Sequence, residues 1–251
     1  MLSSNMVVER SATQEEDMEF KDKSVIVTGA SRGLGFGLVI GLLRRGARVV
    51  GVARDSKALD TAFASLRADK ATVWALSADV RNPDAATRIV GYANAVLGRI
   101  DALFNNASTL GPVPMEELND ASDADWLDVL QANLLGPVRL TRAALPSLTR
   151  HGEGLVVNVS SDAARNAYPT WGLYSASKAA LDHTTAVWRA EQEQAGVCLT
   201  AVDPGEMNTR MHEDAIPDAD PASLRDPNAV AEAILQRLER GEAPARWEVS
   251  L

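Results

Sequence analysis

The amino-acid sequence predicts an α/β protein: a single doubly wound domain whose seven-stranded, mostly parallel sheet is flanked by helices on both faces. Two observations predict this fold. Short apolar runs alternate with longer amphipathic runs from residue 24 onwards, and the first apolar run leads through a glycine-rich turn directly into an amphipathic one. A parallel sheet needs such alternation, because each crossover between parallel strands carries a helix that covers the sheet. The sequence has no internal repeat and no interior linker, so one domain accounts for it.

Seven segments have the length and the apolar character of buried strands. The first, "SVIVTG", precedes the glycine-rich turn, and the last, "ARWEVS", lies near the C-terminus. The seven segments are residues 24–29, 48–53, 72–78, 101–106, 154–161, 197–205 and 245–250. The single cysteine, Cys198, lies in an apolar run and is expected to be a buried strand residue.

Helices are predicted between these strands. The helix after the glycine-rich turn ends at Gly46, because glycine suits a helix C-terminus, and Pro83 marks the start of another helix. A long helix is predicted from Asp123 to Arg150, and Pro137 inside it is expected to bend it. The other predicted helices lie at 56–69, at a segment that carries Tyr174 and ends near Gln194, and at 227–239.

Composition and charge argue against several classes of function. The net charge of −9 argues against nucleic-acid and anionic membrane surfaces, because both require basic patches. The three histidines are scattered, and no metal-ligand spacing appears. No stretch reaches the roughly 18 apolar residues of a membrane span, and residues 1–20 do not have the pattern of a signal peptide. We therefore expect a cytoplasmic protein with residues 1–20 disordered and one domain over 21–251.

The glycine-rich turn after the first strand predicts a phosphate-binding site. In "VTGASRGLG", Gly29, Gly33 and Gly35 stand between a strand and a helix. Glycine lets the backbone approach a pyrophosphate, and the helix N-terminus supplies N–H groups and a partial positive charge. The spacing G-x3-G-x-G differs from the usual dinucleotide-binding spacing, so a tight turn without a ligand is the alternative.

The stretch "YSASK" places a tyrosine and a lysine one helical turn apart. Residues four apart lie on one face of a helix, so Tyr174 and Lys178 are predicted to work as a pair. A nearby ammonium favours the phenolate and lowers the pKa of a tyrosine, which suits it for acid–base catalysis. An ordinary helix pair without a function is the alternative.

Taken together, these motifs resemble the classical short-chain dehydrogenase/reductase family, which has a Rossmann-type fold. The motif T-G-x3-G-x-G looks like the glycine-rich turn of that family, and further motifs follow in the family's order over about residues 21–240. They are "DV" at 79–80, "NNAS" at 105–108, Asn133, Ser161, "YSASK" at 174–178, which begins thirteen residues after Ser161, and "DPGEMNT" at 203–209. Ser108 is a departure, because the family usually has glycine at this position.

The resemblance implies hydride transfer between a nicotinamide cofactor and a carbonyl or secondary alcohol. Tyr174 would be the general acid or base, Lys178 would tune it and bind the nicotinamide ribose, and Ser161 would hydrogen-bond the substrate oxygen. Asn133 would hold a water that connects Lys178 to solvent. The implied cofactor-binding residues are Gly29, Ser31, Arg32, Gly33, Leu34, Gly35, Arg54, Asp79, Val80, Asn106, Ala107, Tyr174, Lys178, Pro204, Gly205, Met207 and Thr209.

Structural roles are the alternatives at four of these positions. Ser161 would cap the end of its strand, and Thr209 would cap a helix. Asp79 would be an acid at the entry of a helix, and Asn133 would be an ordinary hydrogen-bonding residue of the long helix.

The end of the second strand determines which nicotinamide cofactor is expected. An acidic residue there would bind the ribose hydroxyls of NAD(H) and repel a 2′-phosphate. This sequence has Ala53 at that place, followed by Arg54, and Arg32 lies in the glycine-rich turn. Two guanidinium groups suit a phosphate dianion, so the sequence favours NADP(H) over NAD(H). Asp55 is the counter-argument, since it would serve as a displaced ribose acceptor.

Three stretches are predicted to form the substrate wall: residues 108–114, 162–172 and a loop at 210–227 that would act as a lid. Tyr168, Trp171 and Met211 suggest an apolar or aromatic pocket, with simple packing as the alternative. Arg165 is expected to be a solvated charge rather than a ligand for an anion. In the family, the helix that carries Tyr174 and the long helix before it often form a subunit interface, so a homodimer or homotetramer is expected.

The sequence therefore predicts an oxidoreductase that transfers a hydride between NADP(H) and a small carbonyl or alcohol substrate. A reductase of an imine or pterin-type substrate on the same scaffold is the second hypothesis. A non-catalytic nicotinamide-binding regulator is the third, and the intact set of Ser161, Tyr174 and Lys178 argues against it.

Overall fold

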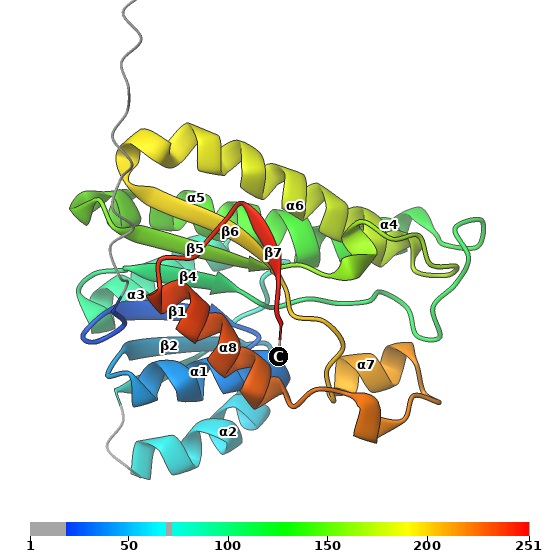
Figure 1. Cartoon of the computed structure of the whole chain (residues 1–251), viewed down its shortest axis with the longest axis horizontal. Coiled ribbons are helices and arrows are strands. Elements are labelled where there is room, and N and C mark those ends of the chain that lie inside the picture. Colours follow the sequence, from blue (N-terminus) through cyan, green and yellow to red (C-terminus); the bar gives the residue numbers. More distant parts are fainter. Residues whose placement is uncertain (1–18, 69–71, 251) are drawn as a thin grey trace, which may run out of the picture.

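The computed structural model describes residues 19–68 and 72–250. At its centre is a seven-stranded sheet with the strand order β3-β2-β1-β4-β5-β6-β7 (Figure 1). Every neighbouring pair of strands is parallel, including β6 and β7. The strands are β1 Ser24–Thr28, β2 Arg48–Ala53, β3 Val73–Ser77, β4 Ala102–Asn105, β5 Gly154–Val159, β6 Val197–Asp203 and β7 Arg246–Glu248. The predicted fold class is confirmed.

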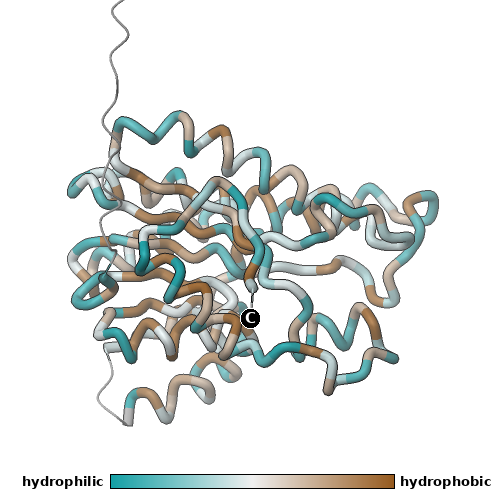
Figure 2. Tube along the Cα trace, viewed as in Figure 1, coloured by the Kyte–Doolittle hydropathy of each residue, from teal (hydrophilic) through white to brown (hydrophobic). Residues whose placement is uncertain are grey.

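Helices cover both faces of the sheet, as Figure 1 shows. The side chains of β1 are apolar on both sides: Val25 and Val27 belong to the core under one helical layer, and Ile26 belongs to the core under the other. The first layer contains α1 Gly33–Arg44, α2 Ser56–Ala68 and α8 Pro227–Glu239. The second layer contains α3 Ala85–Leu97, α5 Gly136–Leu148 and α6 Gly172–Gln192. Apolar residues concentrate in the strands and in the helix faces that meet them (Figure 2).

The long helix predicted at 123–150 is present, but it is not uniform. It consists of α4 Asp123–Leu130, a π-helical stretch Gln131–Leu135, α5, and a 3-10 turn Thr149–His151. Pro137 lies in the first turn of α5, where a missing N–H is tolerated. Because proline has no N–H, it cannot form the regular helical bond to the carbonyl of Asn133, and the π-helical stretch lies at this place. The short helix α7 Arg210–Ala215 lies in the loop after β6.

Two sequence-based expectations need correction. Phe20 was assigned to the disordered leading segment, but it is 1% exposed and its ring centroid lies 6.4 Å from that of Phe104. Its apolar ring fills the core beside β4, so the folded domain begins before residue 21; residues 1–18 lie outside the described residues. Cys198 lies on β6 as predicted, but it is only partly buried, and Nη1 of Arg189 approaches its sulfur to 3.3 Å.

The parallel sheet brings one set of chain segments to a common edge. The carboxyl ends of β1, β4, β5 and β6 all lie there, and the strand order changes direction between β1 and β4. In open α/β sheets this edge is where ligands bind. Within the described part of the chain, no helix is long and apolar enough to cross a membrane. In the same residues, no group of three or more histidine, cysteine, aspartate or glutamate side chains is placed to hold a metal ion.

Candidate active site

The glycine-rich turn lies at the carboxyl end of β1 and packs tightly against the segment after β4. The side-chain amide of Asn106 donates to the carbonyl oxygens of Thr28 and Gly29, at 2.9 and 3.3 Å. A Cβ atom added to Gly29 would lie 2.6 Å from that amide nitrogen, and one added to Gly35 would lie 2.2 Å from the carbonyl oxygen of Gly29. The backbone conformation of Gly29 is also left-handed, with φ of +68°. The glycines are therefore required by close backbone approach.

The N-terminus of α1 fits an anionic group. Helix α1 begins at Gly33, its N-cap residue Arg32 forms no side-chain cap, and its first turn contains no acidic residue. The N–H groups of the first turn have no intrahelical partner, and they carry the positive end of the helix dipole. A Cβ atom added to Gly33 would meet the side chain of Thr209 at 3.3 Å, so the loop after β6 faces this turn directly. The turn can thus hold the pyrophosphate of a dinucleotide.

Tyr174 and Lys178 form a buried pair on α6. Tyr174 is 8% exposed and Lys178 is 2% exposed. The ammonium nitrogen of Lys178 lies 5.5 Å from the centre of the Tyr174 ring, and it donates to the carbonyl oxygen of Val159 at 2.7 Å. The predicted juxtaposition is present, and the end of β5 anchors the lysine.

Burial moves the pKa values of the two groups in opposite directions. Burial raises the pKa of Tyr174 well above its ordinary value, and the charges of Asp203 and Asp162 add to this, while the neighbouring hydroxyl groups of Ser161 and Ser108 oppose it. Burial lowers the pKa of Lys178 to about 8, against the charges of Asp182 and Asp203. The sequence predicted that the lysine would lower the pKa of the tyrosine. The structure gives the opposite direction, because desolvation is the largest influence on the pKa of Tyr174.

Ser161 lies directly after β5 and has two roles. Its hydroxyl donates to the Asp162 carboxylate at 3.0 Å and accepts from the backbone N–H of Ala163 at 3.2 Å, so it caps the short 3-10 helix Asp162–Ala164. The same hydroxyl is close enough to Tyr174 to lower the pKa of its phenol. The two sequence-based alternatives, strand-end cap and site residue, are therefore compatible. The hydroxyl has to leave Asp162 in order to donate to a substrate.

Asn133 is fully engaged by the protein. Its side-chain oxygen accepts from the hydroxyl of Ser108 at 3.1 Å and from the N–H of Thr109 at 2.8 Å. Its side-chain nitrogen donates to the carbonyl of Thr109 at 2.8 Å and to the hydroxyl of Ser177 at 2.9 Å. Since Ser177 in turn donates to the carbonyl of Tyr174 at 2.7 Å, Asn133 fixes the segment after β4 against α6. All hydrogen-bond donors and acceptors of the Asn133 side chain are therefore used, and the side chain cannot bind a water as well. The candidate to bind a water is the backbone carbonyl of Asn133, to which Pro137 cannot donate.

The residues proposed for the adenosine end of a cofactor surround the end of β2 and β3. Burial raises the pKa of Asp79, but Arg81 outweighs burial and lowers it, with a guanidinium–carboxylate distance of 2.7 Å. Arg81 also binds Asp128 at 2.6 Å, an ion pair that the sequence analysis missed. Arg32 and Arg54 are both exposed, and neither forms an ion pair with another residue in 19–68 or 72–250.

Asp55 already has a structural partner. Its carboxylate accepts from the N–H of Ala58 at 3.0 Å, in the first turn of α2. It therefore caps that helix, as an aspartate directly before a helix commonly does. This contact accounts for the acidic residue next to Arg54, and no contact with a ribose is needed to explain it.

The loop after β6 contains the remaining cofactor candidates. Gly205 has φ of +69°, and its N–H donates to the Asp203 carboxylate at 3.0 Å. Met207 pairs with Arg225 in an isolated bridge, and Thr209 caps α7 by accepting from the N–H of His212 at 3.3 Å. Thr209 therefore caps a helix, as the alternative interpretation expected, and it also faces the glycine-rich turn.

The predicted substrate wall is apolar where it meets Tyr174. Leu110, Ala163 and Tyr174 form a cluster against which Met115, Trp171 and Met211 pack. Each of the three predicted stretches, or its immediate continuation, supplies part of this cluster. The rings of Tyr168, Trp171 and Tyr174 follow one another at centroid distances of 5.8 and 5.9 Å. The guanidinium-bearing Arg165 is exposed, in line with a solvated charge.

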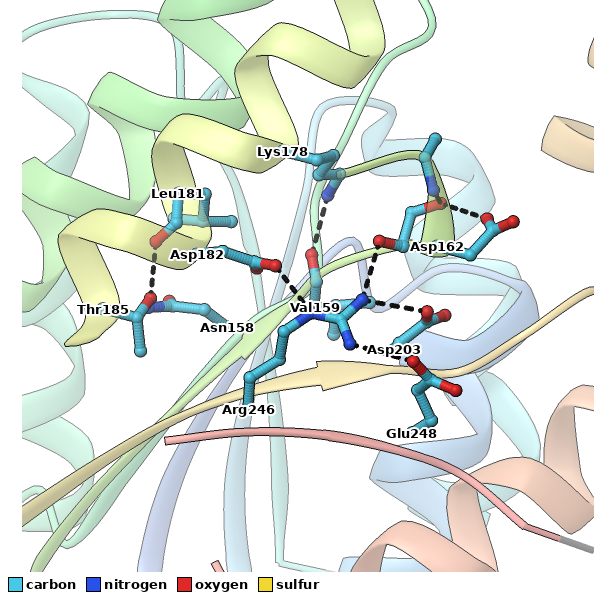
Figure 3. Close-up of polar contacts among 12 residues, drawn as sticks. Asn158, Val159, Asp162, Lys178, Leu181, Asp182, Thr185, Asp203, Arg246 and Glu248 are labelled. Atoms are coloured by element: carbon cyan, nitrogen blue, oxygen red, sulfur yellow. Dashed lines mark hydrogen bonds and ion pairs between the residues drawn. The ribbon is translucent and has the colours of Figure 1, made fainter. Parts of the chain in front are cut away.

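Beside Lys178 lies a charged network that the sequence analysis missed (Figure 3). Arg246 of β7 binds Asp182 of α6 and Asp203 of β6, and it also donates to the carbonyl oxygen of Ser161. Asp182 is one helical turn beyond Lys178, so half of this network was visible as a spacing in the sequence. Arg246 gave no local signal, because its partners are distant in the chain.

Comparison with known families agrees with this geometry. Residues 23–220 match the short chain dehydrogenase family. The chain belongs to this family. Short-chain dehydrogenases are oxidoreductases that bind a nicotinamide cofactor and act on small molecules, so these coarser statements hold for this member as well.

Several relatives resemble this short-chain dehydrogenase over most of its length. The ketoacyl reductase HetN of a Nostoc species is 34% identical over 223 residues, which cover 86% of this chain and 75% of that protein. The 1,6-dihydroxycyclohexa-2,4-diene-1-carboxylate dehydrogenase of Acinetobacter baylyi is 31% identical over 222 residues, covering 88% of this chain and 82% of that protein.

Solved structures have the same fold. A short-chain dehydrogenase from Streptomyces avermitilis superimposes with a TM-score of 0.80 at 28% identity, covering 91% of this chain and 88% of that one. A metagenomic short-chain oxidoreductase in complex with NADP superimposes with a TM-score of 0.77 at 26% identity, covering 93% of this chain and 100% of that one.

Proposed function

We propose that this protein transfers a hydride between NADP(H) and a carbonyl or secondary-alcohol substrate. The observation that carries the proposal is the cluster of Ser161 with the buried Tyr174 and Lys178 beside an apolar wall, at the sheet edge that also bears the glycine-rich turn. The nicotinamide cofactor supplies or accepts the hydride when it is bound. Two of the relatives described above carry names of enzymes that act at an oxygen-bearing carbon, which supports this substrate class.

Tyr174 moves the proton in this reaction. In reduction its hydroxyl donates a proton to the substrate oxygen, and in oxidation the phenolate removes one. The Lys178 ammonium, 5.5 Å from the ring centre, stabilises the phenolate that remains after donation. Ser161 releases Asp162 and donates its hydrogen bond to the same substrate oxygen, where negative charge develops.

Solvent access to Lys178 completes the cycle. The lysine can exchange a proton with a water held by the backbone carbonyl of Asn133, inward to Tyr174 after reduction and outward after oxidation. The Asn133 side chain is saturated, and Pro137 leaves that carbonyl without its usual helical donor. Asn133 also fixes the position of α6 through Ser177.

The glycine-rich turn would hold the pyrophosphate at Gly29, Gly33 and Gly35, with Ser31 and Leu34 beside it. These are the residues that the family resemblance implies for this role. Val80, Asn106 and Ala107 would line the adenosine side, and Pro204, Gly205, Met207 and Thr209 the nicotinamide side. Two observations support NADP(H): Arg32 and Arg54 are exposed and form no ion pair with another described residue, and Asp55 is engaged as a helix cap. A neighbour of the same fold is known in complex with NADP.

The assembly we propose is a homodimer or homotetramer. Two large apolar side chains support this proposal: Leu127 of α4 is 61% exposed and Val187 of α6 is 45% exposed. These helices are the ones expected to meet a second subunit. Size-exclusion chromatography with light scattering tests the state, and a monomer at all concentrations would contradict it.

A substrate panel tests the function. Purified protein is incubated with NADPH or NADH and with ketones, aldehydes, a cyclic imine and a dihydropterin, and cofactor oxidation is followed by absorbance. We expect turnover of at least one apolar or aromatic ketone, with a higher kcat/KM for NADPH than for NADH. Turnover of only the imine or the dihydropterin would replace the carbonyl assignment, and tight NADPH binding without any turnover would indicate the regulator.

A further inference from the structure

Arg246 lies near Lys178 and binds three separate segments of the chain (Figure 3). Its side chain is 9% exposed. Its Nε donates to the Asp182 carboxylate at 2.7 Å, and its Nη2 donates to the Asp203 carboxylate and to the carbonyl oxygen of Ser161, both at 3.1 Å. Its Nη1 donates to the exposed carboxylate of Glu248 at 3.1 Å.

The segments that Arg246 joins each carry part of the proposed reaction. Ser161 is the hydroxyl that faces Tyr174, and Asp182 lies one turn beyond Lys178 on α6. Asp203 ends β6 and holds the N–H of Gly205, at the start of the proposed nicotinamide loop. An arginine fork can bind several acceptors in fixed directions, so a single side chain aligns β5, β6 and α6.

Arg246 also pairs with the two buried carboxylates near Lys178. Asp182 and Asp203 are 14% and 4% exposed, and both carboxylates bind Arg246. Lys178 binds no carboxylate among the described residues; its partner is the carbonyl of Val159. The Asp182 oxygen that Arg246 does not bind is buried and has no hydrogen-bond partner within the described chain. Without Arg246, this carboxylate is the natural partner of the ammonium four residues before it.

The charged and titratable groups around Lys178 come from every element packed against it. They are Tyr174 and Asp182 on α6, Asp203 at the end of β6, Asp162 after β5, and Arg246 and Glu248 on β7.

We propose that Arg246 is a positioning residue of the active site: it sequesters Asp182 and Asp203, so that the Lys178 ammonium serves Tyr174, and it fixes the backbone of Ser161. This inference rests on the proposed function for its catalytic consequence. Its electrostatic part concerns the protein alone and can be measured without a substrate.

The first arm measures the charge state of Lys178 by NMR. The chain has only five lysines, so protein labelled with 13C at the lysine ε-carbon gives few signals, and Lys178→Arg assigns the one of interest. In the native protein we expect this signal to titrate at a pKa of about 8. Arg246→Gln removes a cation and frees two carboxylates, so the pKa of Lys178 rises by about one unit or more. Asp182→Asn removes the charge that most raises the pKa of Lys178, so this pKa should fall in that variant.

The second arm measures turnover with the best substrate of the panel. We expect Arg246→Gln to lower kcat by about tenfold to a hundredfold, as displacement of catalytic groups does. The double variant Arg246→Gln with Asp182→Asn should recover part of that loss, because the competing carboxylate is gone. Arg246→Lys keeps the charge and loses the fork, so it should keep the Lys178 pKa near the native value but still lower kcat. Arg240→Gln, which removes an exposed arginine–glutamate pair on the protein surface, is the matched control.

The outcomes separate the two proposals. A purely structural role for Arg246 predicts that the double variant is no more active than Arg246→Gln, and that the pKa of Lys178 does not move; either result overturns the inference. If Arg246→Gln does not fold, Arg246→Lys decides the inference through kcat: a lowered kcat supports it, and a native kcat overturns it. If the native protein turns over no substrate, the proposed function fails, while the NMR arm still supports or rejects the role of Arg246.

Discussion

The buried lysine makes a specific prediction for the pH dependence of stability. Lys178 is 2% exposed, and burial lowers its pKa in the folded protein to about 8 from an ordinary value of 10.5. Between these two values the unfolded chain binds a proton at Lys178 that the folded protein does not bind. The free energy of unfolding therefore rises as the pH increases, because stability rises with pH wherever the unfolded state binds more protons. Below the lower value, the cost of burying the charged lysine is present in full.

The size of this effect follows from the pKa values. Between pH 7 and pH 9 the folded lysine changes from mostly charged to mostly neutral, whereas the unfolded lysine stays charged. Integrated over this interval, the linkage gives a gain of about 1 kcal/mol in the free energy of unfolding. Lys178→Met has no charge to lose and should lack this gain. Lys57→Met, at an exposed lysine of α2, should keep it.

The assay is urea unfolding at pH 7, 8 and 9, at one fixed protein concentration, so that any association contributes equally. The difference between the native protein and Lys178→Met cancels the titration of all other groups. The reasoning is refuted if this difference is the same at pH 7 and pH 9, or if the native protein loses stability relative to Lys178→Met as the pH rises.

Two further substitutions test the proposed catalytic pair and the proposed cofactor site. Ser108→Ala removes a hydroxyl that lowers the pKa of Tyr174, so we expect the pKa to rise further and kcat to fall about fivefold, the worth of one neutral hydrogen bond; a pH–rate profile identical to that of the native protein would argue against this role. Arg54→Ala should weaken NADPH binding by about tenfold or more and leave NADH binding unchanged, because a charge-assisted phosphate contact is lost. Equilibrium fluorescence titration measures both affinities, and Arg67→Ala, at another exposed arginine of the same region, is the control.

The order of strands and helices along the chain, and the Tyr174–Lys178 pair of the candidate site, could be predicted from the sequence for physical reasons. Strands buried on both faces are apolar throughout, and the spacing of Tyr174 and Lys178 on a helix places them on one face. The close contact of Gly35 with the Gly29 carbonyl shows why glycine stands at that position. Each of these features depends on residues near one another in the chain or on a strand–turn–helix context.

Other properties of the site depend on the three-dimensional arrangement and could not be read this way. Arg246 reaches Ser161 across 85 positions and Asp203 across 43, so no local pattern announces it. The pKa of Tyr174 depends on how completely the fold excludes water, which spacing does not report. The engagement of Asn133 by Ser108 required the structure, although the departure from glycine at Ser108 marked the place to look.

The measurement that tests the central claim most directly is the turnover of Tyr174→Phe with the best substrate of the panel. The phenol hydroxyl is the only group removed, and Ser161 and Ser108 keep their bonds to Asp162 and Asn133, so the variant should fold and bind NADPH like the native protein. We expect kcat to fall by about 10²–10⁴-fold, the usual contribution of a general acid. Near-native turnover in a folded Tyr174→Phe variant that binds NADPH would contradict the assignment of Tyr174 as the proton donor.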